Sequence, residues 1–312
     1  MTPILEVRGL SIAFRQYEAG TRQRSLPVIR DLSLTVGAGQ IVAVVGSSGS
    51  GKSLLAHGIL HILPYNSCMQ GEMRFCGMPL TAERAASLRG REMVLVPQGV
   101  TYLDPLMRVG PQVRRGQRTA RARAKCREVL ARYGLDADTE NLYPFELSGG
   151  MARRVLISTA VMETPRLILA DEPTPGLDAR AAARILGHFR ELADAGAGIL
   201  LITHDLELAL TVADRVAVLY AGETVEEAAA QDFAAGRLRH PYTQALWAAL
   251  PQNGFTPIPG TQPYPGNIPA GCQFAPRCRH CRTACRAQAS IPYRPAEGGY
   301  VRCLRPEGGW TT

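Results

Sequence analysis

A glycine-rich stretch that begins at Gly46 has the residue types needed to bind a chain of phosphates. It fits the phosphate-loop pattern G-x-x-x-x-G-K-[ST] at every fixed position and consists of Gly46, Ser47, Ser48, Gly49, Ser50, Gly51, Lys52 and Ser53. Glycines let backbone N–H groups approach phosphate oxygens closely, and a helix beginning near Ser53 would add partial positive charge. Lys52 could then reach the β- and γ-phosphates, and Ser53 could bind Mg²⁺. The stretch predicts a nucleoside triphosphate site, in which we include Leu54.

Two acidic residues at the end of an apolar run could carry out hydrolysis. Asp171 and Glu172 follow Leu167–Ala170, and ligands of α/β sheets bind at the carboxyl ends of strands. Asp171 is suited to hold Mg²⁺, directly or through water, and Glu172 is suited to polarise the attacking water as a general base. Alone, such a strand end is more often structural. Downstream of a phosphate loop it predicts a nucleotide-hydrolysing site.

The elements that must position these residues are those of an α/β domain. Five near-continuous apolar runs alternate with helical patterns: Ile41–Val45, Met93–Val96, Leu167–Ala170, Ile199–Thr203 and Val216–Tyr220. Such runs suit strands buried on both faces of a sheet. The segment from about 103 to 162 has helical periodicity and no strand-like run, so we expect a helical insertion there. We expect this domain to cover residues 1–228.

Length and composition limit the classes of protein to which this chain can belong. A chain of 312 residues predicts about two domains. No apolar run reaches the ~18 residues that a membrane-spanning helix needs, and the N-terminus lacks the order of a signal segment, so we expect a cytoplasmic location. The net charge of +8 permits an anionic partner. The most basic stretch, Arg114–Arg132, favours a solvated helix face, with lipid headgroups or a partner subunit as the alternatives.

Ser148, Gly149 and Gly150, within Leu147–Met151, resemble the signature of the ABC transporter ATPases. The resemblance implies an ABC-type ATPase fold: a RecA-like parallel sheet core, an antiparallel β part and a helical insertion. It also implies that the signature contacts ATP held by the phosphate loop of a second, homologous or identical ATPase subunit. Two half-sites would then close over two nucleotides.

Further positions match the family's pattern. Gln98 resembles the glutamine that senses Mg²⁺ and water, His204 the switch histidine that contacts the γ-phosphate, and Asp178 the D-loop aspartate that crosses the dimer. The resemblance thus implies a catalytic set of Glu172, His204, Lys52 and Gln98, and a Mg²⁺ site of Ser53, Gln98 and Asp171. For adenine stacking we favour Phe14 over Tyr17, although either could be a core aromatic.

The C-terminal part resembles the ATPases of dipeptide, oligopeptide and nickel importers, most specifically in His240–Leu246 and Ile268–Cys278. The resemblance implies two transmembrane permease subunits, an extracytoplasmic substrate-binding protein and a peripheral place on the cytoplasmic face of the membrane. Peptide is the favoured cargo, with nickel or a metal–metallophore complex as the alternative. A soluble ABC ATPase acting on nucleic acid or ribosomes is a rival. The single cassette and the lack of a heptad run argue against it, so we expect no nucleic acid partner. A regulatory module without hydrolysis is a second rival.

Five cysteines crowd into the last part of the chain, within a predicted irregular extension of residues 229–312. Cys272, Cys278, Cys285 and Cys303 have the spacing C-x5-C-x6-C-x17-C, with Cys281 as a spare. Four thiolates can hold a [4Fe–4S] cluster or a zinc ion, whereas a disulfide is disfavoured in the cytosol. The family resemblance points to the cluster, and zinc or no metal stay as alternatives. A metal here would supply folding energy that the few apolar residues cannot.

Overall fold

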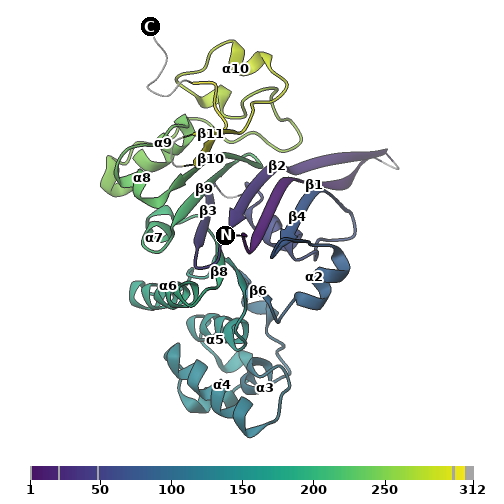
Figure 1. Ribbon diagram of the computed structural model, residues 1–312, viewed down its shortest axis with the longest axis vertical. Coiled ribbons are helices and arrows are strands. Elements are labelled where there is room, and N and C mark those ends of the chain that lie inside the picture. Colours follow the sequence, from purple (N-terminus) through teal and green to yellow (C-terminus); the bar gives the residue numbers. More distant parts are fainter. Residues whose placement is uncertain (1, 20–21, 48, 297–298, 306–312) are drawn as a thin grey trace.

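Two β-sheets form the framework of the computed structural model, which describes residues 2–19, 22–47, 49–296 and 299–305 (Figure 1). The larger sheet has the strand order β11-β12-β10-β9-β3-β8-β7-β6. Its strands are β3 (Ile41–Gly46), β6 (Met93–Val96), β7 (Leu167–Asp171), β8 (Gly198–Thr203), β9 (Arg215–Tyr220), β10 (Glu223–Ala229), β11 (Arg294–Ala296) and β12 (Gly299–Val301). Neighbours from β9 to β6 pair in parallel, whereas β10, β12 and β11 pair antiparallel. The five apolar runs predicted as strands are β3 and β6 to β9, so that prediction is confirmed.

The smaller sheet is antiparallel and has the order β2-β1-β4-β5. Its strands are β1 (Leu5–Ala19), β2 (Arg22–Val36), β4 (Ser67–Phe75) and β5 (Met78–Pro79). The far ends of β1 and β2 form an arm that protrudes from the body (Figure 1). This sheet and α1 (Lys52–Ile59) pack one side of the main sheet, in a core cluster that includes Leu32, Val44 and Leu55.

The other face of the main sheet is covered by three helices of the second core cluster. α5 (Gly149–Val161), α6 (Ala179–Asp194) and α9 (Pro241–Ala248) contribute Leu156, Phe189 and Tyr242 to this cluster. The remaining helices of the ATPase part are α2 (Ala82–Leu88), α3 (Val109–Val113), α4 (Ala120–Arg132) and α7 (Leu206–Leu210). Because β3 and β7 are buried along their whole length between these layers, the residues that follow them are held rigidly.

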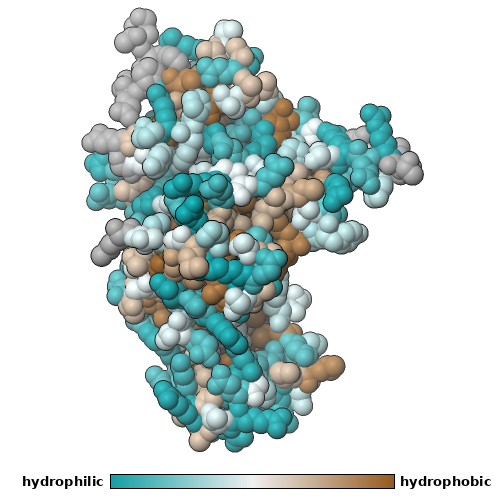
Figure 2. Space-filling model, turned by 45° about the vertical axis from the view of Figure 1, so that its right-hand side comes forward, coloured by the Kyte–Doolittle hydropathy of each residue, from teal (hydrophilic) through white to brown (hydrophobic). Residues whose placement is uncertain are grey.

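The predicted helical insertion is confirmed and lies at one end of the molecule, where α3, α4 and α5 pack together (Figure 1). In α4 the buried residues recur at helical spacing: Ala122, Cys126, Val129 and Leu130. Arg121, Arg123 and Arg127 lie on its exposed face, and hydrophilic residues are spread over this end of the molecule in Figure 2. No helix in the parts of the chain that the structure describes combines the length and apolar character needed to cross a bilayer.

As far as the structure describes it, the C-terminal extension consists of short elements, among them α8 (Ala230–Ala234), α9, α10 (Ala284–Ala287), β11 and β12. Between α9 and α10 lies a largely irregular stretch rich in proline and glycine. Strand β12 pairs with β10, so the extension continues the main sheet. Buried Arg302 anchors the extension to the ATPase part by donating to Thr224 O (3.2 Å) and Asp31 Oδ2 (2.9 Å). It also donates within the extension, to Ile291 O (2.8 Å). The extension is therefore packed against the ATPase part through buried polar contacts.

Candidate nucleotide site

The phosphate loop lies at the carboxyl end of β3 and leads into α1, as the sequence predicts. Gly46 packs so closely against β9 that an added Cβ would lie 2.3 Å from Leu219 O, so only glycine fits. Gly51 caps α1 with φ 92°, a left-handed conformation that glycine adopts without strain. The loop backbone therefore faces the cleft at a helix N-terminus, where anions bind.

The Lys52 ammonium lies inside the loop. Its Nζ donates to Gly46 O at 2.8 Å and to Ser47 O at 3.0 Å. Burial lowers the pKa of Lys52, and the neighbouring carboxylates of Glu172 and Asp171 raise it in part. A phosphate entering the loop would offer the ammonium a second anionic partner.

Asp171 and Ser53 form an oxygen pair suited to Mg²⁺. Burial raises the pKa of Asp171, while a hydrogen bond with the Ser53 side chain lowers it in part. Asp171 is only 3% exposed, and its Oδ1 has no hydrogen-bond partner among the described residues. A buried carboxylate oxygen without a partner is costly unless a cation or proton compensates it. Because Mg²⁺ prefers carboxylate and hydroxyl oxygens, these residues fit the ion.

Glu172 is held by Thr203, the last residue of β8, and by His204, which follows it. Its Oε1 lies 2.9 Å from His204 Nδ1, and its Oε2 accepts a hydrogen bond of 3.4 Å from Thr203 Oγ1. The Glu172 backbone has φ 47°, a left-handed conformation that a non-glycine residue adopts at some cost. Such strain clusters at functional sites, where the surrounding structure must hold it.

The predicted catalytic residues meet around one cleft of about 520 Å³. Its lining consists of Val28, Gly49, Gly51, Lys52, Ser53, Leu54, Gln98, Glu172 and His204. The cleft thus combines a loop backbone suited to phosphate, the Lys52 ammonium, the candidate metal ligands Ser53 and Gln98, and a carboxylate with a histidine partner. This is the set of groups that phosphoryl transfer to water requires.

Arg153 is a residue of the site that we did not predict. Its guanidinium NH1 donates to Pro97 O and to Glu172 O, both at 3.2 Å, and the side chain is buried. Arg153 therefore fixes the backbone of Glu172 to the segment that carries Gln98. In the sequence, the signal for this role was a charged residue within the apolar pattern of the helix that follows the signature.

Several predicted residues lie away from this cleft. Ser148 caps α5 by accepting from Met151 N at 3.2 Å, and Asp178 caps α6 by accepting from Ala181 N at 2.8 Å. Ser148 and Gly149 are exposed and Gly150 is half-buried, so their contact with a second subunit stays a prediction. Phe14 is half-buried on β1 and packs against the core cluster of the smaller sheet rather than lining the cleft, so its adenine contact also stays a prediction. Ser50 is buried, and Ser48 lies outside the described residues.

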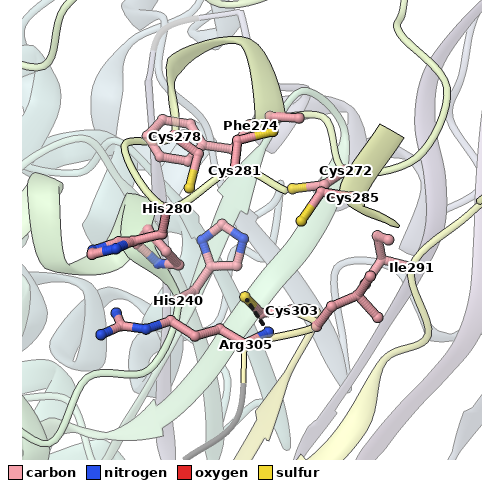
Figure 3. Close-up of a pocket in the computed structure, with 13 residues that line it drawn as sticks. His240, Cys272, Phe274, Cys278, His280, Cys281, Cys285, Ile291, Cys303 and Arg305 are labelled. Carbon is pink, nitrogen blue, oxygen red and sulfur yellow. Dashed lines mark hydrogen bonds between the residues drawn. The ribbon is translucent and has the colours of Figure 1, made fainter. Parts of the chain in front are cut away.

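The cysteines of the extension line a second, much smaller pocket (Figure 3). Cys272, Cys278, Cys281, Cys285 and Cys303 surround it together with His240 and His280. Burial raises the pKa of Cys272 to about 12, and raises those of Cys278 and Cys303 as well. Among the described residues, no group of three or more His, Cys, Asp or Glu side chains is placed so that it could hold a metal ion. The four predicted ligands share one pocket, but without the closeness that one bound ion demands.

Two protein families match this chain. Residues 29–175 match the family described as ABC transporter, and residues 225–285 match the family described as oligopeptide/dipeptide transporter, C-terminal region. A putative peptide import ATP-binding protein of Brucella ovis is 34% identical over 97% of both chains. The oligopeptide transport ATP-binding protein OppD of Bacillus subtilis is 34% identical over 97% of this chain and 88% of its own.

A longer relative and a solved structure extend these matches. OppD of Mycobacterium tuberculosis is 37% identical over 98% of this chain, which spans only 52% of that protein's length. The dimeric bacterial ABC transporter cassette MJ0796 superposes with a TM-score of 0.63 and 25% identity, covering 72% of this chain and 98% of its own. The same cassette has also been solved as a dimer in a post-hydrolysis state bound to ADP and Pi. These matches confirm the predicted fold class.

Proposed function

The chain belongs to the ATP-binding proteins of the ABC transporter family, in the branch with the oligopeptide/dipeptide transporter C-terminal region, and we propose that it hydrolyses ATP to drive peptide import across a membrane. The observation that carries this proposal is the cleft in which Lys52, Glu172 and His204 meet. Dipeptides or oligopeptides are the proposed cargo because the similar proteins are peptide transporters by name. No observation favours the nickel or metallophore alternative.

The residues of the cleft divide the work of hydrolysis. The loop N–H groups and Lys52 bind the β- and γ-phosphates and stabilise charge on the transferring phosphoryl group. Glu172 accepts the proton of the attacking water. His204 lies 2.9 Å from the Glu172 carboxylate and orients that carboxylate. Ser53 and Asp171, with Gln98 at the cleft wall, would hold Mg²⁺, which neutralises charge on the phosphate oxygens when bound.

A second ATPase subunit would complete each nucleotide site. Ser148 and Gly149 lie exposed at the N-terminus of α5, and Asp178 lies at the N-terminus of α6. A helix N-terminus with free N–H groups suits a γ-phosphate presented by another chain. The dimeric state of the similar cassette supports this arrangement. The further proposed partners are two permease subunits and an extracytoplasmic binding protein, with the chain on the cytoplasmic face of the membrane.

We assign residues 1–228 to the ATPase domain and residues 229–312 to the extension. Within the extension, we propose a [4Fe–4S] cluster held by Cys272, Cys278, Cys285 and Cys303. The shared pocket supports this, since a cluster spaces its four thiolates more widely than a single ion does. Zinc is the alternative. Protein purified without oxygen should be brown and contain iron and sulfide, and Cys278→Ser should lose both. Colourless protein that contains zinc would overturn the cluster.

Phosphate release from MgATP by the purified chain tests the main proposal. Turnover should require Mg²⁺ and should rise when the permease subunits are present. The rival nucleic-acid function predicts salt-sensitive RNA or DNA binding instead. A chain that binds RNA and neither binds nor hydrolyses ATP would contradict the transporter assignment.

A further inference from the structure

The C-terminal extension touches the phosphate loop directly, at Ser47. The Ser47 hydroxyl donates a hydrogen bond to Gln262 Oε1. We propose that the extension positions the phosphate loop for ATP, with Gln262 and, from α9, Tyr242 acting through Ser47. This inference rests on the proposed ATP-binding function.

Tyr242 makes the second contact from α9. Burial raises the pKa of Tyr242, and hydrogen bonds with the side chain and backbone of Ser47 lower it in part. The Tyr242 ring is 2% exposed and packs against Tyr220 at 4.5 Å and Phe274 at 5.4 Å between ring centroids. Because the ring is buried and packs against two other rings, its hydroxyl is presented to Ser47 at little entropic cost.

Gln262 is presented by a segment that is also fixed. The Arg277 guanidinium donates to Pro259 O at 2.7 Å and to Ile258 O at 3.1 Å, and to the Tyr220 hydroxyl at 3.2 Å. Beyond Gln262, the backbone oxygen of Gly266 accepts a hydrogen bond from Arg24 on β2. The segment from 258 to 266 is thus attached at both ends and runs past the loop as a strap.

The strap supports the loop without competing for phosphate. Ser47, Tyr242 and Gln262 are not among the described residues that line the cleft. The Ser47 carbonyl oxygen accepts a hydrogen bond from Lys52 Nζ, so a fixed Ser47 also places the ammonium. The contacts therefore hold the loop and its lysine in one arrangement before the nucleotide enters, which lowers the ordering cost of binding.

Tyr242→Phe tests the inference because it keeps the ring packing and removes only the hydroxyl. In the full-length chain the Kd for the non-hydrolysable analogue MgAMPPNP should rise about three- to tenfold, the worth of one neutral hydrogen bond. In ATP hydrolysis the KM should rise by a similar factor with kcat changed less than twofold. Amide hydrogen exchange of the nucleotide-free protein should accelerate across residues 41–55, because the loop has lost an anchor.

Tyr293→Phe is the matched control. Tyr293 is another tyrosine of the extension, and its hydroxyl donates to Glu227 Oε2 at 3.4 Å rather than to the loop. This variant should leave the Kd and the exchange of 41–55 unchanged. Ser47→Ala combined with Tyr242→Phe should cost less than the product of the two single effects, since both act through one residue.

The outcomes separate this inference from the proposed function. If the wild-type chain fails to bind MgAMPPNP, the ATPase function fails, and the exchange of 41–55 still reports whether the extension holds the loop. If the wild type binds and Tyr242→Phe binds equally well or more tightly, the positioning role is wrong. Additive effects in the double variant, or an equal change in Tyr293→Phe, would also overturn it.

Discussion

The nucleotide cleft and the cysteine pocket differ in how each holds its binding groups before a ligand arrives. In the cleft, β3 leads into the loop that ends at Lys52, β7 ends in Asp171 and Glu172, and β8 leads to His204, so these groups come from the rigid centre of the sheet. Glu172 already lies 2.9 Å from His204, and Asp171 already has a hydrogen bond with Ser53. In the cysteine pocket, Cys285 lies on the four-residue helix α10 and the other thiols lie on irregular segments around a small space. A pre-organised site gains its affinity from the fold, whereas a loop-built site needs its ligand to become ordered.

The largest expected effect lies in the cleft. Glu172→Gln keeps the size of the side chain and removes the carboxylate that accepts the proton, so kcat should fall about 10²–10⁴-fold. Nucleotide binding should persist, because the phosphate contacts come from the loop. The measurement is phosphate release together with MgATP affinity.

Glu207→Gln is the control for this variant, since Glu207 is exposed on α7 and lies outside the cleft. Its turnover should match the wild type. Near-normal hydrolysis by Glu172→Gln would remove Glu172 from the role of general base.

The next effect concerns the attachment of the extension. Arg302→Met leaves the Thr224 and Ile291 carbonyl oxygens without their donor, so the free energy of unfolding should fall by about 3 kcal/mol. Chemical denaturation measures this loss. Arg286→Met, at an exposed position on α10, should change it by less than about 0.5 kcal/mol. Equal stabilities would show that Arg302 does not anchor the extension.

The pH dependence of the cysteine pocket sharpens the contrast. The folded pKa of Cys272 is raised to about 12 from an ordinary value of 9.0, so the folded state favours the protonated thiol. Its contribution to stability is complete below pH 9 and is lost as the pH rises toward 12.

Thiol ligation releases protons, so the zinc affinity of the metal-free protein should increase as the pH rises from 6 to 8. Calorimetric titrations in buffers of different ionisation enthalpy count the protons. A Cys272→Ser protein with an unchanged proton count would refute ligation by this thiol.

The smallest effect separates a helix cap from a nucleotide contact. Ser148→Ala and Thr119→Ala each remove a hydroxyl that caps a helix, α5 and α4 respectively, and each should cost about 1 kcal/mol of stability. Only Ser148→Ala should also weaken ATP-dependent dimerisation, because Ser148 and not Thr119 belongs to the signature segment that would meet the partner's nucleotide. Sedimentation with MgATP in a Glu172→Gln background measures the dimer. Equal dimerisation by both variants would limit Ser148 to capping.

Much of the fold and of the cleft could be predicted because their signals are local. The strands before Lys52, Asp171 and His204 are continuous apolar runs. Asp171 ends β7, His204 directly follows β8, and Lys52 follows β3 through the phosphate loop, whose motif is itself local. The short strands β11 and β12 carry no such signal, since each has only three residues, too few to show a periodicity, and β11 contains a proline. Arg153 was missed for a related reason: its role depends on the carbonyl oxygens of Pro97 and Glu172, which helical periodicity does not reveal.

The amino-acid sequence by itself determined the order of the phosphate loop, the signature and the acidic strand end, and hence the family and its chemistry. The tertiary structure alone decided that Ser53 meets Asp171, that His204 meets Glu172, and that the extension reaches Ser47 through Gln262. The reason is physical. Motifs and buried strands can be recognised from residues that are neighbours in the sequence. A contact between side chains far apart in the chain forms only when the sheet has assembled and the core has packed.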